Sequence, residues 1–148
     1  MALLLDPVDF GDYQPNHYRE IIYPPAVSGT LTQGDNRFAN GEYDVALDYY
    51  ELVITRSPEV VVRALFKAGL ANVALGNFDR AEAWYTEGLQ HAEVANDAVA
   101  VLLAQADLIQ FANRADVDIS PLLALLRSTN LDLEVEINDA STAFALAQ

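Results

Sequence analysis

The chain has 148 residues, of which 52% are hydrophobic, so we expect one domain with a packed core and exclude global disorder. It contains no cysteine, which excludes disulfides and thiolate metal sites. The formal net charge of −14 disfavours nucleic-acid binding, because an acidic surface repels phosphate groups. An acidic, lysine-poor composition is typical of proteins adapted to high intracellular salt, but an ordinary acidic cytosolic protein would show it too.

No targeting or membrane segment is expected from the order of residues. The N-terminal letters MALLLDP contain no basic residue, which disfavours a cleaved secretory signal. The other apolar runs are interrupted by charges before they reach the length that spans a bilayer. We therefore expect a cytoplasmic protein without membrane insertion.

Residues 1–30 are interpreted as an extended arm. Four of the six prolines lie there (Pro7, Pro15, Pro24 and Pro25), and no helical period continues through them. The arm also contains several aromatic and aliphatic residues, which is unusual for a free linker. It is expected to pack into the groove of its own domain or against a neighbouring chain.

Residues 31–113 are predicted to form a helical domain. The apolar periodicity and the turn residues place helices at about 32–39, 43–55, 59–75, 78–94 and 98–112. Gly41 and Gly76 are expected to end the first and third helices in a left-handed conformation, and Asn96 and Asp97 to contribute the N-cap of the fifth. Since the connections are very short, neighbouring helices must pack antiparallel.

Residues 114–148 are interpreted as a C-terminal cap or tail. In SPLLALLRS, Ser120 is predicted as an N-cap with Pro121 at the first helical position. The letters LDLEVEIN at 131–138 alternate strictly between apolar and polar residues, which is the period of a strand. A capping helix would also bury Leu133 and Ile137, so both possibilities stay open.

One pattern of residues is written twice, 35 positions apart. The stretch GEYDVALDYY at 41–50 is followed by GNFDRAEAWY at 76–85, with glycine, aromatic and alanine residues in the same places. Gly34 and Gly69 form another pair at this spacing. A helical hairpin of this size cannot bury its own apolar face, so it is copied and stacked.

This pattern resembles the tetratricopeptide repeat, a helix–turn–helix unit. The matching residues are Gly41, Tyr43, Ala46, Tyr50 and Pro58 in the first copy and Gly76, Phe78, Ala81 and Tyr85 in the second, where Glu93 stands in place of the proline. The resemblance implies an all-α fold, a short right-handed α-solenoid of antiparallel helical hairpins. A third unit beginning at residue 98 is only partial.

In this family, the resemblance implies, the first helices of the hairpins line a concave groove that holds a peptide or a partner's helix. Carried over by position, the groove-facing residues are Leu31, Asp35, Phe38 and Ala39, then Arg63, Phe66, Lys67, Leu70 and Val73. As partner-binding residues we select Arg37, Phe38, Arg63, Phe66, Lys67 and Leu70. The clustered cations could bind an acidic or C-terminal carboxylate segment, or could pair with local acids such as Glu59.

The function expected from these observations is a non-catalytic protein–protein interaction module, an adaptor or scaffold. The alternative is a structural subunit of a larger secretion, surface or virion assembly, which docks or oligomerises through the arm and the tail. Asp44 and Asp48 share a helix face, but no nucleophile motif, phosphate loop or metal spacing accompanies them. We therefore expect no enzymatic activity, cofactor or metal.

Overall fold

The computed structural model describes residues 24–133; residues 1–23 and 134–148 lie outside the described part of the chain. The helices are α2 (Pro25–Ala39), α3 (Tyr43–Arg56), α4 (Val62–Ala74), α5 (Phe78–Ala95), α6 (Ala98–Ala115) and α7 (Ser120–Arg127). No strand occurs in this range, and the predicted all-α class is confirmed.

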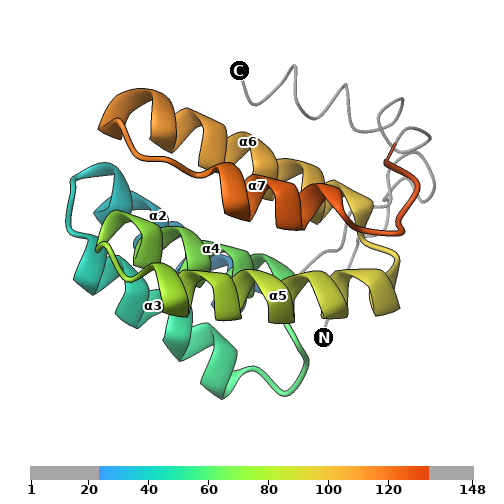
Figure 1. Cartoon of the computed structure of the whole chain (residues 1–148). Coiled ribbons are helices and arrows are strands. Elements are labelled where there is room, and N and C mark those ends of the chain that lie inside the picture. The colour runs from blue at the N-terminus through green and yellow to red at the C-terminus, as the bar shows by residue number, and fades with distance from the viewer. Residues whose placement is uncertain (1–23, 134–148) are drawn as a thin grey trace.

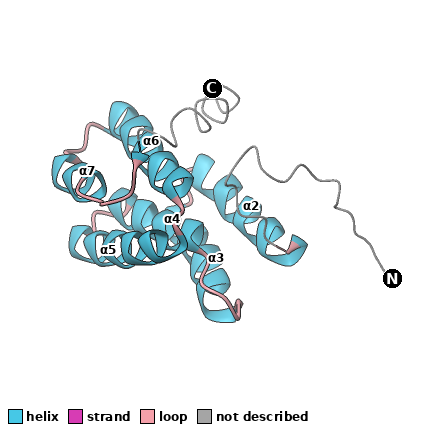
Figure 2. Cartoon of the chain, turned by 90° about the vertical axis from the view of Figure 1, so that its right-hand side faces the viewer, coloured by secondary structure: helices cyan, strands magenta, loops and turns pink. Residues whose placement is uncertain are grey.

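The helices form three successive hairpins, with α6 and α7 lying over one side of the first two (Figures 1 and 2). Helix α4 lies at the centre, and nine of its 13 residues are buried. Its residues belong to two apolar clusters, one shared with α2 and α3 and the other with α5, α6 and α7. Burial on both sides of α4 therefore holds the hairpins together as one solenoid.

The ends of the helices repeat as closely as the sequence does. Gly41 and Gly76 both have φ of +82°, a left-handed conformation that side chains disfavour. The amide after each glycine reaches back to the helix: Glu42 N donates to the Arg37 carbonyl at 2.9 Å, and Asn77 N to that of Asn72 at 2.8 Å. The predicted role of these glycines is confirmed.

In each of the first two hairpins a glycine of the first helix lies against a tyrosine ring of the second. A Cβ atom added to Gly34 would lie 2.5 Å from Tyr50 Cε1, and one added to Gly69 would lie 2.7 Å from Tyr85 Cε2. Ala46 and Ala81, at which the sequence predicts the helix crossings, are fully buried. The close packing of the helices therefore requires glycine at positions 34 and 69, just as it requires a small residue at positions 46 and 81.

Two predicted helix starts were wrong. Helix α2 begins at Pro25 and not at residue 32, because a proline is well suited to the first turn of a helix, where its missing amide donor would be unpaired anyway. Helix α4 begins at Val62 and not at residue 59. Ser57, which precedes Pro58, is held extended (ψ 132°), and Val61 is also extended and buried.

The C-terminal part differs from the prediction in one detail. Ser120 is the first residue of α7 and not its N-cap; the Asp118 carboxylate instead accepts a hydrogen bond from the Ser120 amide at 3.0 Å. Of the predicted strand at 131–138, only residues 131–133 are described, and they are not in a strand. The rest of this prediction lies outside the described residues, as do residues 1–23 of the arm predicted at 1–30. Residues 25–30 of that arm are not extended but belong to α2.

Candidate functional site: the groove between the first helices

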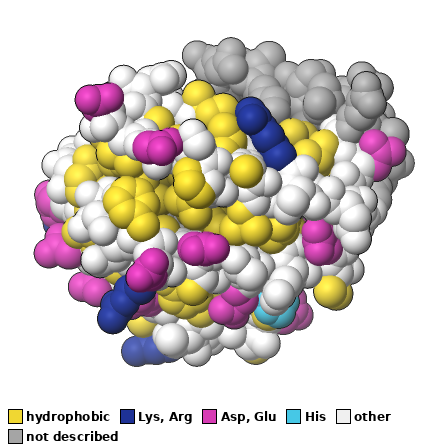
Figure 3. Space-filling model, in the orientation of Figure 1, with side chains coloured by type: hydrophobic (Ala, Val, Ile, Leu, Met, Phe, Trp, Pro, Cys, Tyr) yellow, Lys and Arg dark blue, Asp and Glu magenta, His cyan; other side chains and the backbone are white. Residues whose placement is uncertain are grey.

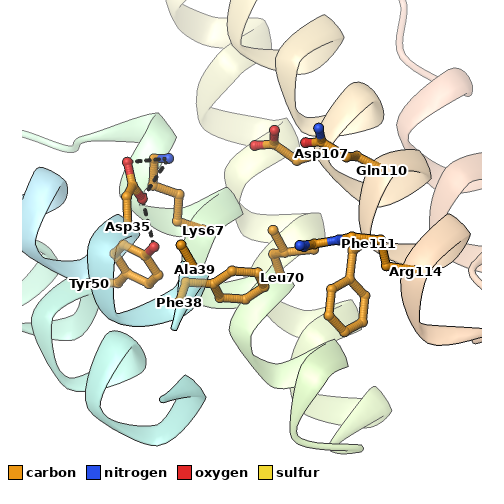
Figure 4. A pocket seen from close by; sticks show the side chains of 10 residues that line it. All are labelled: Asp35, Phe38, Ala39, Tyr50, Lys67, Leu70, Asp107, Gln110, Phe111 and Arg114. Atoms are coloured by element: carbon orange, nitrogen blue, oxygen red, sulfur yellow. Dashed lines mark hydrogen bonds and ion pairs between the residues drawn. The ribbon is translucent and has the colours of Figure 1, made fainter. Parts of the chain in front are cut away.

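A cavity of about 320 Å³ lies between the first helices of the three hairpins (Figure 4). Helix α2 contributes Asp35, Phe38 and Ala39, and α4 contributes Lys67 and Leu70. The other lining residues are Tyr50 of α3 and Asp107, Gln110, Phe111 and Arg114 of α6. The cavity thus has an apolar floor and charged walls, a composition suited to holding part of another polypeptide.

An ion pair joins two of the repeats across this groove. Lys67 Nζ donates to both carboxylate oxygens of Asp35, at 3.0 and 3.1 Å, and the Tyr50 hydroxyl donates to Asp35 Oδ1 at 2.6 Å. Lys67 also lies 6.0 Å from the centre of the Tyr50 ring. The lysine is therefore neutralised by a residue from the preceding hairpin.

Three aromatic rings pack together at the groove, and two of them, Phe38 and Phe111, line it. The ring of Phe38 lies 4.9 Å from that of Tyr43 and 5.8 Å from that of Phe111, and Tyr43 and Phe111 are 6.0 Å apart. These distances are in the range of favourable aromatic pairs. Phe111 therefore packs the C-terminal end of α6 against the first hairpin.

Asp107, like Arg114, is a charged residue of the groove that forms no ion pair within the described residues. Burial raises the pKa of its carboxyl; Lys67 and Arg63 act against this rise, and Asp35 adds to it. No hydrogen bond to Asp107 is formed within the described residues. A half-buried carboxylate without a direct partner can accept a hydrogen bond or an ion pair from a ligand.

The structure brings together three of the six predicted site residues, Phe38, Lys67 and Leu70. Arg37 instead forms an exposed ion pair with Glu42, at 2.8 Å. Phe66 is buried (4% exposed), with its ring 5.9 Å from that of Tyr85. No ion pair joins Arg63 to Glu59 or to any other described residue. The binding role of all six residues stays a prediction.

The lining residues from α6 were missed. Their signal was weak, because the third unit lacks the glycine–aromatic–alanine pattern that located the first two. Periodicity predicted a helix at 98–112 but gave no indication of which face it presents to the groove. The contacts of Phe111 with Phe38 and Tyr43, and the apolar cluster that α6 shares with α4, place it there.

Within residues 24–133 no group of His, Asp and Glu side chains is arranged to hold a metal ion. None of the described helices combines the length and the apolar character needed to cross a membrane. Neither finding adds chemistry to the groove beyond the contacts above.

The comparison with family models gives one match, to the tetratricopeptide repeat, over residues 31–98. These residues contain both Gly–Tyr hairpins and the short turns at Gly41 and Gly76. Residues 31–98 are tetratricopeptide repeats. The match ends at the start of α6, so the third hairpin lies beyond it. Neither the curated proteins nor the solved structures gave a match to the chain.

The equivalent tyrosines of the two repeats, Tyr50 and Tyr85, differ in their hydrogen bonding within the described residues. This difference gives a test of the hydrogen bond between Tyr50 and Asp35. Asp35 of the first repeat corresponds to Leu70 of the second, so the Tyr85 hydroxyl is buried without a hydrogen-bond partner in the described part of the chain. Tyr50→Phe should lower the free energy of unfolding by about 1 kcal/mol, whereas Tyr85→Phe should be neutral or stabilising. Urea denaturation measures both, and an equal loss would contradict this difference.

A second test concerns pH. Because the pKa of Asp107 is raised in the folded chain, its favourable contribution to stability is present below the pKa of the unfolded chain and is lost as pH rises through the folded pKa. Asp107→Asn should therefore stabilise the protein at pH 7, by roughly 0.5–1 kcal/mol. Denaturation of both proteins at acidic and neutral pH should show this gap closing in acid. A less stable variant at pH 7 would mean that the carboxylate is held by a partner.

Proposed function

We propose that the chain is a non-catalytic adaptor or scaffold that holds a peptide segment of a partner protein in the groove between α2, α4 and α6. The observation that supports this best is the cavity itself, with Phe38, Leu70 and Phe111 as apolar surface and charged groups on both sides. A side chain of the peptide packs on these residues, and Asp107, Gln110 and Arg114 bind its polar groups. The family match supports a protein partner, since tetratricopeptide repeats are interaction modules.

The charges of the groove do not favour the acidic peptide considered from the sequence. Lys67 is paired with Asp35 and Arg37 with Glu42, so two of the three clustered cations are already neutralised. Asp107 and Arg114 add one charge of each sign, and neither forms an ion pair within the described residues. A peptide without strong net charge is therefore the expected occupant.

The test fills the groove without disturbing the core. Ala39 is an exposed lining residue at the end of α2, so Ala39→Trp blocks the cavity and leaves the buried residues in place. The control is Ala95→Trp, because Ala95 is also exposed and is also the last residue of its helix, α5. Peptides selected from a random phage-displayed library on the wild-type protein should bind the Ala95 variant and not the Ala39 variant. Equal binding to both variants would contradict the proposal that the peptide binds in this groove.

The alternative is a structural subunit that docks through its N-terminal arm (1–30) and its C-terminal tail (114–148), and it depends mainly on residues 1–23 and 134–148. They lie outside the described part of the chain, so this alternative stays a prediction from the sequence.

A further inference from the structure

A second groove lies at the start of α5, away from the cavity between the first helices. It has a volume of about 580 Å³ and is lined by Phe78, Val117, Pro121 and Leu122, with Asp79, Glu82 and Asp118 as its acidic residues. The Phe78 side chain is 44% exposed, although it stands at a position of the repeat where an aromatic residue normally packs. The groove therefore combines an uncovered aromatic ring with a rim of carboxylates.

Comparison of the two repeats shows what is unusual about Phe78. Its counterpart Tyr43, 35 positions earlier, packs against the rings of Phe38 and Phe111. No described aromatic ring packs on Phe78 in this way. Instead, the connection between α6 and α7 forms the opposite wall of an open groove. An apolar side chain from another molecule could fill the place that Phe111 fills beside Tyr43.

The acidic surface continues from this groove along α5. A shallow hollow on the helix is lined by Asp79, Glu82, Glu87 and His91, among others, so Asp79 and Glu82 belong to both depressions. Arg80 lies between them in sequence but lines neither. On the face that carries α5 and α7, hydrophobic side chains gather across the middle, and the charged side chains around them are mostly acidic, with a few basic ones (Figure 3). This face favours a ligand with positive charges around an apolar anchor.

The negative charge of this protein argues against occupation of the groove by the ends of the chain or by a second copy. Residues 134–148 contain three acidic residues and no lysine or arginine, and residues 1–23 contain four acidic residues and one arginine. A second copy would bring another net charge of −14 to the same surface. Each of these occupants meets electrostatic repulsion at Asp79, Glu82 and Asp118.

We propose that this groove is a second protein-binding site, whose ligand is a basic segment with one large apolar side chain. The apolar side chain packs on Phe78 between Val117 and Leu122. Lysine or arginine residues on either side pair with Asp79, Glu82 and Asp118, and further ones lie along Glu87. The site is separate from the groove between α2, α4 and α6, and it does not depend on peptide binding there.

The probe is a fluorescein-labelled lysine–alanine peptide with one central phenylalanine. A length of about 12 residues covers roughly 18 Å as a helix, the extent of α5 from Asp79 to His91. Fluorescence anisotropy with the full chain measures its affinity. A peptide with glutamate in place of every lysine should not bind, and one with serine in place of the phenylalanine should bind at least about tenfold more weakly.

The decisive variant is the double reversal Asp79→Lys with Glu82→Lys, and its matched control is Asp44→Lys with Asp48→Lys. Asp44 is the repeat counterpart of Asp79, is also exposed, and both pairs change the net charge equally. The groove variant should lose at least about tenfold in affinity while the control stays within about twofold of wild type. Phe78→Ser should also lose at least about tenfold. An equal loss in the two double variants would overturn the proposal, because it would show attraction to the overall charge only.

Amide NMR spectra of the full chain, together with sedimentation equilibrium, distinguish the proposed ligand from two other possible occupants of the groove, the chain's own tail and a second copy. The probe should shift signals of residues 78–82 and 117–122 and not those of Ala39 or Leu70. If Phe78→Ser alone shifts signals of residues 134–148, the chain's own tail occupies the groove and the proposal is wrong. Self-association of the wild type that Phe78→Ser abolishes, measured by sedimentation equilibrium, would identify a second copy as the occupant and would equally overturn it.

Discussion

Gly69→Ala should lower the free energy of unfolding by about 1–3 kcal/mol. In an isolated helix the same change would be favourable by about 0.5–1 kcal/mol, because alanine loses less backbone entropy than glycine. Here the new Cβ would lie 2.7 Å from Tyr85 Cε2 and 2.8 Å from Cδ2. The Tyr85 ring is fully buried in the central apolar cluster, so it cannot move aside without displacing its neighbours.

The control for this substitution is Gly29→Ala. Gly29 also lies inside a helix, but a Cβ added there would meet nothing within 4 Å. This variant should therefore be more stable than the wild type by about 0.5–1 kcal/mol. Urea denaturation gives both values. If Gly69→Ala stabilised the protein as Gly29→Ala does, the close approach of α4 to Tyr85 would be contradicted.

The repeated part of the fold was predictable because its constraints are local and occur twice. A left-handed helix end at Gly41 predicts one at Gly76, and both have φ of +82°. The pairing of Gly34 with Tyr50 likewise corresponds to that of Gly69 with Tyr85. Each of these features depends on the small size or the backbone freedom of one residue type, which the spacing of 35 makes visible in the sequence.

The groove was only partly predictable because its contacts join residues far apart in the chain. The sequence suggested Glu59 as a partner for the cations of α4, four positions before Arg63, whereas Lys67 pairs with Asp35 of the preceding hairpin. Local spacing on one helix could not reveal this pair, since it depends on how α2 and α4 are placed side by side. The same holds for Asp107 and Phe111, which reach the groove only through the packing of α6.

Phe111→Ala should have the largest effect of the changes considered, a loss of about 3–5 kcal/mol in the free energy of unfolding. The Phe111 side chain is 5% exposed and contacts the rings of both Phe38 and Tyr43. Phe78→Ala is the matched control. Its ring is 44% exposed, so its loss should be within about 0.5 kcal/mol. An equal loss in the free energy of unfolding for the two variants would contradict the conclusion that Phe111 holds α6 against the first hairpin.

Hydrogen exchange tests whether that loss is local. Phe111 is the ring through which α6 contacts the first hairpin, and the family match does not extend over α6 and α7. In Phe111→Ala, amides of α6 should therefore exchange faster relative to those of α4, whose burial against α3 and α5 is unchanged. Because Phe111 also forms one wall of the groove, the same variant should lose the peptides selected on the wild type. Faster exchange in α6 with unchanged peptide binding would separate the stability of the third hairpin from the function of the groove.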